Sequence, residues 1–290
     1  MITVVADAAP AVGMGHVSRC SALAAALTGP VRCLAFEAPG AFERDGVSWT
    51  PWTGEIDELE ADVAVIDGYR FDPTQLAARL PVALFHDGGE VPPGVALVIA
   101  PIARGDGWLN GFEYACLRRE FWEQAPHTGG AGVLVTTGAG SEGDELAESV
   151  AVALATPPTV VRGPASHLRA PAGAIVLDAP PSLRAPLRAA DVVIATGGQT
   201  SLEAAACGTP AVLLALDRAQ AEQAQRLARA GAALLAATPE AAARAAQDLL
   251  ADPDQRARMS EAGQQAVDGR GAHRVARRVE ALRTRRGAAT

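Results

Sequence analysis

Short runs of Val, Ile, Leu and Ala recur through the first half of the chain and alternate with polar or helix-like stretches. The runs are continuous rather than interrupted by polar residues, which is typical of parallel strands buried on both faces. Parallel strands need crossover connections, so the pattern predicts an α/β domain. The expected strands are 2–6, 31–35, 63–66, 82–85 and 96–99, the expected helices are 18–27 and 73–79, and 51–60 is expected to be a loop leading into a short helix.

The second half repeats this pattern after a polar stretch, 123–132, that contains Pro and Gly and is typical of a domain boundary. We therefore expect two Rossmann-like parallel-sheet domains facing each other across a cleft. Their expected ranges are 1–126 and 127–290, with the last helix a candidate to pack back on the N-terminal domain. The expected strands of the second half are 133–136, 159–162, 174–177, 192–195 and 211–214, and the expected helices are 144–155, 202–207, 218–230, 239–251, 253–263 and 271–285.

The composition fits a folded protein, since 49% of the 290 residues are hydrophobic and 20% are charged. A net charge of −8 argues against a nucleic-acid partner, which would require a basic face. The four cysteines fall singly, so we expect reduced thiols and no metal site. No apolar run approaches the ~20 residues of a membrane span, and no basic leader precedes the first strand, so we expect a cytoplasmic protein.

A glycine-rich loop containing Gly13 and Gly15 lies between the first expected strand and helix. Such a loop lets backbone approach an anion at the helix N-terminus. Ser18 stands where a dinucleotide-binding loop has its third glycine, so an NAD site is not expected. The helix dipole keeps His16 neutral and able to accept a proton, and Arg19 lies one turn later. Alternatively, His16 only caps the helix and Arg19 is solvated.

Polar residues follow several of the expected strands: Asp7 follows the first, Asp67-Gly68 the third and His86-Asp87 the fourth. Ligands of open α/β sheets bind beyond the carboxyl ends of the strands, so these residues are expected at one rim. Asp87 is a candidate contact to a sugar. The alternative for His86-Asp87 is a hydrogen-bonded rim without a ligand.

A second glycine loop, Gly197-Gly198-Gln199-Thr200, repeats the anion-site pattern in the other half. Glu203 lies one turn into the following helix, where a carboxylate opposes phosphate but suits a sugar diol. We interpret the loop as a diphosphate site with Glu203 on a ribose. The alternative is that Glu203 only complements the helix dipole.

Together, four segments resemble the UDP-2,4-diacetamido-2,4,6-trideoxy-β-L-altropyranose hydrolases of pseudaminic acid biosynthesis, which belong with the GT-B glycosyltransferases. The C-terminal half is also similar to the N-acetylglucosaminyltransferase of peptidoglycan synthesis. The most specific segment is the Gly-x-Gly-His-x-x-Arg loop. The four segments are Gly13-Met-Gly-His-Val-Ser-Arg19-Cys, Val65-Ile-Asp67-Gly-Tyr69, Tyr114-Ala-Cys-Leu-Arg118-Arg-Glu-Phe121 and 190–210.

The resemblance implies a GT-B fold and cleavage of UDP from an anomeric carbon by water, without a metal, a cofactor or an obligatory protein partner. It implies that His16 is the base. Binding of the nucleotide and its phosphates is implied for Gly13, Gly15, Gly197, Gly198, Gln199, Thr200, Glu203 and Gln220, and contacts to the sugar for Arg19, Asp67, Tyr69 and Asp87.

Two departures from the family pattern put the substrate in doubt. Ala219 precedes Gln220 where the family has Asn, and 138–144 replaces a Gly-Gly-x-Asp turn. The leading expectation is therefore a nucleotide-sugar hydrolase with an open sugar identity. The alternatives are a GT-B glycosyltransferase that uses a UDP-sugar donor and a non-catalytic nucleotide-binding subunit.

Overall fold

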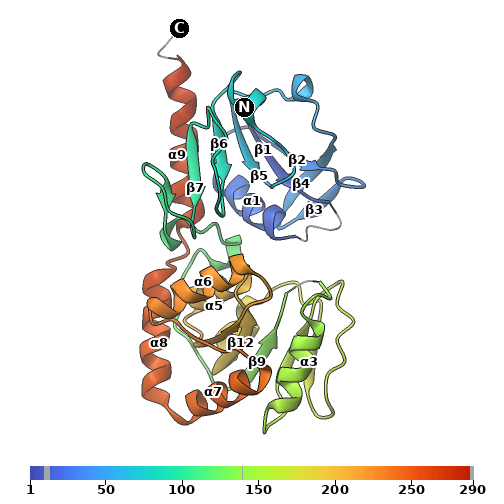
Figure 1. Cartoon of the computed structure of the whole chain (residues 1–290), viewed down its shortest axis with the longest axis vertical. Helices are drawn as coiled ribbons and strands as arrows, with labels where there is room; N and C mark the ends of the chain where they lie inside the picture. The colour runs from blue at the N-terminus through green and yellow to red at the C-terminus, as the bar shows by residue number, and fades with distance from the viewer. Residues whose placement is uncertain (10–13, 139, 288–290) are drawn as a thin grey trace. The chain divides into compact units, whose positions relative to one another are not determined.

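The computed structural model describes residues 1–9, 14–138 and 140–287 and divides the chain into two compact units (Figure 1). The first unit comprises Met1–Trp122 and Gly269–Thr290, and the second comprises Glu123–Asp268. The division therefore comes four residues before the expected position (126 − 122), and the last helix belongs to the first unit. Gln124 explains the earlier division, because its side chain donates to backbone oxygens of Gln264 and Val267 in the second unit.

The first unit is built on a sheet with the strand order β3-β4-β2-β1-β5-β6-β7-β8. All neighbouring strands are parallel except β3 and β4. The five expected strands form its centre, where every residue of β1 and β5 is buried. The strands are β1 Ile2–Asp7, β2 Val31–Phe36, β3 Phe42–Arg44, β4 Val47–Trp52, β5 Val63–Asp67, β6 Val82–Phe85, β7 Leu97–Ala100 and β8 Leu109–Asn110.

The antiparallel hairpin β3–β4 lies between two expected elements, in a stretch for which no strand was expected, and its last two residues extend into the expected loop 51–60. Its turn contains Asp45 and Gly46, both with positive φ angles of 53° and 75°. Asp-Gly is the preferred pair for such a two-residue hairpin turn. The strand then runs through Pro51 to Trp52, so the expected loop at 51–60 begins later, and the 3-10 turn Ile56–Glu58 follows.

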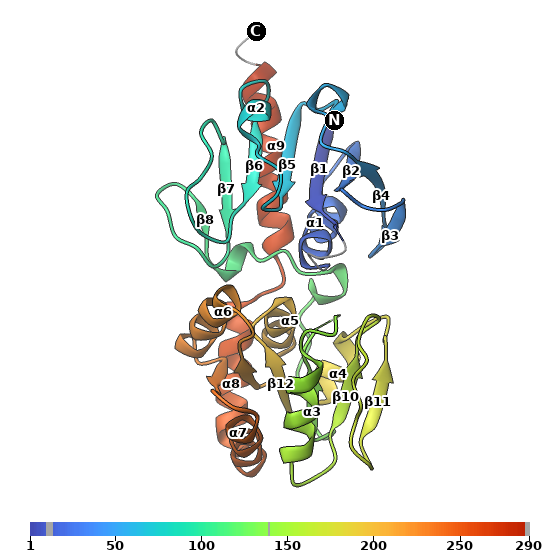
Figure 2. The ribbon, with the colours of Figure 1, turned by 45° about the vertical axis from the view of Figure 1, so that its right-hand side comes forward.

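Helices α1 (Gly15–Ala26) and α9 (Gly271–Gly287) cover one face of this sheet (Figures 1 and 2). The alternate residues Ile2 and Val4 of β1 pack against this layer, and Val275 and Val279 of α9 are fully buried in it. Val5, on the opposite face, packs in a second cluster with the segment around α2 (Thr74–Ala77). Both faces are covered, which accounts for the continuous apolar runs.

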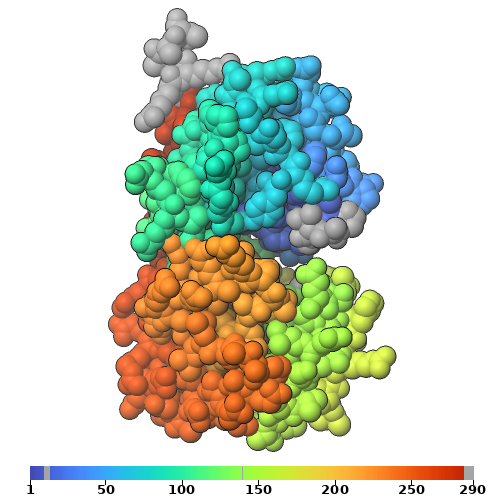
Figure 3. All heavy atoms as spheres, in the orientation of Figure 1, coloured from blue at the N-terminus to red at the C-terminus, as the bar shows by residue number. Residues whose placement is uncertain are grey.

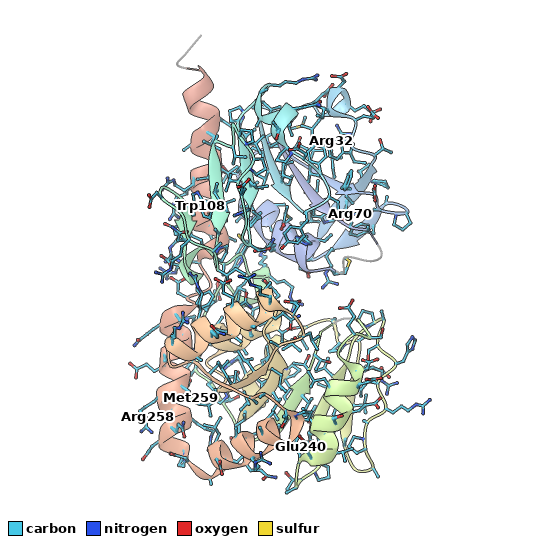
Figure 4. All side chains as sticks on the ribbon, in the orientation of Figure 1. Arg32, Arg70, Trp108, Glu240, Arg258 and Met259 are labelled. Carbon is cyan, nitrogen blue, oxygen red and sulfur yellow. The ribbon has the colours of Figure 1, made fainter. Side chains whose placement is uncertain are left out.

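The second unit has an entirely parallel sheet with the order β11-β10-β9-β12-β13-β14. Helices α3 and α7 pack on one face, and in Figure 3 their side chains, with those of α6, form much of the surface turned to the viewer. Met259 of α8, labelled in Figure 4, also joins this core. The strands are β9 Val133–Thr136, β10 Thr159–Arg162, β11 Ile175–Asp178, β12 Val192–Thr196, β13 Ala211–Leu214 and β14 Ala233–Leu235; the helices are α3 Asp144–Ala153, α4 Arg184–Ala189, α5 Gln199–Cys207, α6 Arg218–Arg229, α7 Pro239–Ala251 and α8 Pro253–Ala266.

Helix α4 and strand β14 were not expected from the sequence. Helix α4 has only six residues, with Pro186 in its first turn, and β14 is a short edge strand in an Ala-rich stretch. Helix α5 begins at Gln199 instead of 202, so the second glycine loop passes directly into it. Among the helices of the described ranges, none is long and apolar enough to span a bilayer.

Candidate active site

The site in the first unit lies where the order of the strands in the sheet reverses. From β1 the chain goes to β2 on one side and later to β5 on the other. The carboxyl ends of β1 and β5 therefore form the topological switch point at which α/β sheets bind ligands. Helix α1 follows β1, Asp67 ends β5 and Asp87 follows β6, and these three elements bring five predicted residues into one cluster: His16, Arg19, Asp67, Tyr69 and Asp87.

His16 and Asp67 form a hydrogen-bonded pair. The Nδ1 atom of His16 lies 2.6 Å from Oδ1 of Asp67, whose side chain is fully buried. Because an ionised carboxylate only accepts hydrogen bonds, Nδ1 donates to Asp67, and Nε2 is the ring nitrogen that Asp67 does not engage. Nε2 makes no hydrogen bond to any residue in the described part of the chain. The pair has the arrangement of a general base oriented by a carboxylate.

Arg19 lies between the two carboxylates of Asp67 and Asp87. Its Nη2 is 2.7 Å from Asp67 and 2.8 Å from Asp87, and its Nη1 is 2.9 Å from Asp87. Its Nε also donates to Asp67, and the guanidinium stacks over the Phe85 ring. The guanidinium is therefore hydrogen-bonded to two carboxylates, so it is not solvated and it fixes the cluster.

The Asp67 and Asp87 carboxylates stay ionised in this setting. Burial alone would raise the pKa of Asp67, but the charge of Arg19 and hydrogen bonds from Arg19 and His16 outweigh burial and lower it. The same balance holds the pKa of Asp87 well below its usual range, with Tyr69 as a further donor. Two carboxylates and one guanidinium leave one net negative charge beside His16, which stabilises the imidazolium once a proton is taken.

The hydroxyl of Tyr69 is hydrogen-bonded, while most of the residue is exposed. Its hydroxyl donates to Oδ2 of Asp87 at 2.5 Å, and its ring meets the His16 ring edge-on at 5.2 Å. Burial and the neighbouring Asp87 raise the pKa of the Tyr69 phenol, so the hydroxyl remains a donor. With 68% of the residue exposed, the ring offers an apolar surface beside the His16 ring.

A second ion-pair group lies at the same rim, and of its residues only Asp7 was singled out from the sequence. Arg70, labelled in Figure 4, donates from Nε to Asp7 at 2.9 Å and pairs with Glu37. Gly68 is needed here because a Cβ would lie 2.7 Å from the Cβ of Asp7. The position of Arg70 directly after Asp67-Gly68-Tyr69 was the available signal.

The second glycine loop lies at the switch point of the other sheet, between β12 and α5. Gly198 is the N-cap residue of α5, and Gln199 and Thr200 begin that helix. A Cβ on Gly197 would lie 2.1 Å from the backbone oxygen of Gln220 on α6, so this position accepts only glycine. The second glycine loop, the start of α5 and helix α6 are thus packed closely against one another.

The remaining predicted residues of this loop have varied surroundings. Glu203 is only 2% exposed on α5, so its carboxylate lies inside the unit. The side-chain oxygen of Gln220 accepts a hydrogen bond from the backbone N–H of Leu216 at 3.3 Å. The Gln220 side chain is therefore bonded to the segment that leads into its own helix, α6. The neighbour Ala219 lies at the same start of α6.

Gly13, Gly15 and the segment 138–144 were also singled out from the sequence. Gly13 lies outside the described residues, and a Cβ on Gly15 would meet nothing within 4 Å. In the segment 138–144, Asp144 accepts hydrogen bonds from Ser166 and His167 and so ties two loops together. Within the described residues, no group of three or more His, Cys, Asp or Glu side chains is arranged to hold a metal ion.

The comparison with protein families matches one segment of the chain. Residues 196–284 match the model described as "Glycosyl transferase-like". The match begins at the second glycine loop. No curated protein matches the chain.

Solved glycosyltransferase structures share the fold over nearly their whole length. MurG of Acinetobacter baumannii is 18% identical with a TM-score of 0.60, covering 96% of this chain and 98% of that chain. Spinosyn forosaminyltransferase is 15% identical with a TM-score of 0.68, covering 98% and 99%. Spinosyn rhamnosyltransferase complexed with thymidine diphosphate is 17% identical with a TM-score of 0.68, covering 96% and 99%. The chain therefore has the α/β GT-B fold of these glycosyltransferases, with a glycosyl transferase-like segment at 196–284.

Proposed function

We propose that this protein is a glycosyltransferase that moves a sugar from a nucleoside diphosphate donor to an acceptor hydroxyl, with His16 as the general base. The observation that carries this proposal is the His16–Asp67 pair, in which Nδ1 is held at 2.6 Å and Nε2 is left without a partner among the described residues. The glycosyl transferase-like match of 196–284 supports the transferase class over our leading expectation of a hydrolase.

The proposed reaction is a single displacement. Nε2 of His16 takes the proton of the acceptor hydroxyl, whose oxygen attacks the anomeric carbon. The bond from that carbon to the diphosphate oxygen breaks, the nucleoside diphosphate leaves with the electron pair, and the configuration inverts. A positioned base contributes about 10²–10⁴-fold to such a step. Asp67 stabilises the imidazolium, and Arg19 positions Asp67 without touching the substrate.

The donor's nucleotide is assigned to the second unit. Gly197, Gly198 and the start of α5 are proposed to bind the diphosphate, because a helix N-terminus after a glycine loop offers N–H groups and partial positive charge. The structurally similar rhamnosyltransferase complexed with thymidine diphosphate supports a nucleoside diphosphate as ligand. Glu203 remains the proposed ribose contact, and Gly15 a proposed diphosphate contact.

The sugar is proposed to contact Tyr69 and Asp87. The exposed Tyr69 ring provides an apolar face for sugar C–H groups, and its position beside His16 orients the sugar toward the base. Asp87 accepts from both Arg19 and Tyr69, so it holds the shape of this surface.

A hydrolase that uses water as acceptor is the second candidate. It is favoured by one specific observation: the residues of two segments that resemble the UDP-sugar hydrolases, His16, Arg19, Asp67 and Tyr69, meet in one cluster. The chemistry at His16 would be the same, with water losing the proton. The acceptor therefore distinguishes the two candidates.

The deciding experiment is incubation of the purified protein with UDP-sugars and TDP-sugars, with and without alcohol acceptors, while released nucleoside diphosphate is measured. Release that depends on an added acceptor supports the transferase, and release of free sugar in water supports the hydrolase. A His16→Gln variant should lower kcat about 10²–10⁴-fold with the affinity for UDP or TDP retained. His167, exposed in the second unit, provides the matched control His167→Gln. Nucleotide binding without turnover in either assay would favour a non-catalytic subunit.

A further inference from the structure

Gln223 on α6 is a buried polar residue that the sequence interpretation did not assign. It is 9% exposed, and its side-chain amide reaches across to the second glycine loop. Nε2 donates to the backbone oxygen of Gly198 at 2.7 Å and lies 3.0 Å from the hydroxyl oxygen of Ser201. Gln220, the glutamine we had predicted, points its side-chain oxygen to Leu216 instead.

The backbone oxygen of Gly198 collects three donors. Besides Gln223, it accepts from the backbone N–H of Ser201 at 3.0 Å and from the hydroxyl of Ser201 at 2.7 Å. A carbonyl oxygen has two lone pairs, so three donors saturate it and hold its direction. The carbonyl of Gly198 therefore faces α6 and the first turn of α5.

The direction of this carbonyl determines the direction of the next N–H. In a trans peptide, the C=O of one residue and the N–H of the following residue point in opposite directions. All described peptide bonds are trans, so the N–H of Gln199 points away from Gln223. A reversed peptide would turn the partial negative charge of the carbonyl toward a bound diphosphate.

The adjacent glycine prevents α6 from being displaced easily. The backbone oxygen of Gln220 lies 2.1 Å from where a Cβ of Gly197 would be, and Gly197 donates its own N–H to Leu214 at 3.0 Å. Backbone packing at Gly197 and the side-chain hydrogen bond at Gly198 thus join α6 to the loop at two consecutive residues.

We propose that Gln223 is a positioning residue of the diphosphate loop: it holds the Gly198 carbonyl away from the ligand so that the N–H groups at the start of α5 face the diphosphate. This inference rests on the proposed nucleotide site of the second unit. It assigns Gln223 to donor binding and not to the chemical step, which belongs to His16.

The test measures UDP and TDP affinity by calorimetry, together with KM and kcat for the donor that is turned over. Gln223→Leu should raise the nucleotide Kd and the donor KM about 10- to 100-fold, because the Gly198 carbonyl loses the donor that directs it toward α6, while kcat at saturating donor changes less than about threefold. Gln225, exposed on the same helix, gives the matched control Gln225→Leu, which should change neither constant.

Gln223→Glu provides a readout that a merely structural role would not move. An ionised Glu cannot donate to the Gly198 carbonyl, whereas a protonated one can. Burial raises the pKa of such a carboxyl, so the affinity defect of Gln223→Glu relative to the original protein should shrink as the pH falls from about 8 to about 5. A pH-independent defect would contradict the proposed hydrogen bond.

The outcomes separate this inference from the proposed function. If the original protein binds neither UDP nor TDP, the proposed site fails and the role of Gln223 with it. If the original protein binds and folded Gln223→Leu binds equally well, the inference alone is overturned. Should Gln223→Leu not fold, Gln223→Glu decides: nucleotide Kd and donor KM equal to those of the original protein at about pH 8, where the introduced carboxylate cannot donate, would overturn the inference.

Discussion

Arg19 shows how a single side chain can determine the stability of the whole cluster at the first rim. It pairs with both Asp67 and Asp87, which are 0% and 12% exposed at their side chains. Replacing one partner of a buried ion pair leaves uncompensated charge and costs about 3–5 kcal/mol. We expect Arg19→Met to lower the free energy of unfolding by this amount in urea denaturation at neutral pH. Arg104→Met, at an exposed position, is the control and should change it by less than about 0.5 kcal/mol.

The same cluster predicts a pH dependence with a definite sign. Because the pKa values of Asp67 and Asp87 are lowered in the folded protein, their stabilisation is present above the unfolded value of about 4 and is lost as the pH falls below it. In Arg19→Met, burial without the cation raises both pKa values. The destabilisation by Arg19→Met should therefore be larger at about pH 7 than at about pH 4, as measured by urea unfolding at both pH values. Equal destabilisation would contradict the ion-pair assignment.

Five residues singled out from the sequence meet in one cluster, while the roles assigned to them stay predictions. His16, Arg19, Asp67, Tyr69 and Asp87 were all named from the sequence, and the structure brings them together. What the sequence could not supply was their pairing, because the roles of Arg19 and Tyr69 depend on distances between residues that lie 18 to 68 positions apart.

Gln223 lay beyond sequence reasoning for a related reason. Along α6 it is one of three glutamines, Gln220, Gln223 and Gln225, whose spacing alone does not distinguish them. Only packing of α6 on the glycine loop separates the buried Gln223 from the exposed Gln225.

At the scale of elements, the sharp corner between α7 and α8 depends on Asp252. Its side chain accepts from the backbone N–H of Gln255 at 2.8 Å, and Pro253 begins α8. Loss of an N-cap hydrogen bond costs about 1 kcal/mol. We expect Asp252→Ala to lower the stability of the second unit by about this amount in thermal unfolding. Asp248→Ala, at an exposed position within α7, should leave it nearly unchanged.

Buried parallel strands were predictable and peripheral ones were not. Strands such as β9 and β13 are buried at every residue, so their apolar runs stand out in the sequence. The edge strand β14 and strand β3 have three residues each, strand β4 is partly exposed like both of them, and the sequences of these strands contain polar residues or alanines. Their pairing with the rest of the sheet, which is tertiary, decides their conformation.

At the scale of the whole molecule, each unit has its own core, and the last helix belongs to the first. Val279 of α9 and Val160 of β10 are both fully buried, in the first and second unit respectively. Truncation to alanine should cost about 2 kcal/mol in either case. We expect calorimetry to resolve two unfolding transitions. Val279→Ala should lower the temperature of one transition, and Val160→Ala should lower the temperature of the other.

Nucleotide binding shows which transition belongs to which unit. UDP or TDP at saturating concentration should raise the temperature of the transition affected by Val160→Ala, because a ligand stabilises the unit that binds it. A shift of only the transition affected by Val279→Ala would contradict assignment of the nucleotide to the second unit.

The return of the chain to the first unit at Gly269 sets an order for folding during synthesis. When Asp268 has been translated, the whole second unit has been made, whereas the first still lacks α9, which packs on α1 and β5. At about 5–20 residues per second, the helix arrives roughly one to four seconds later. Although it begins at the N-terminus, the first unit is therefore the last to complete its core, and its uncovered strands are the stretch of the nascent chain that most needs protection by a chaperone.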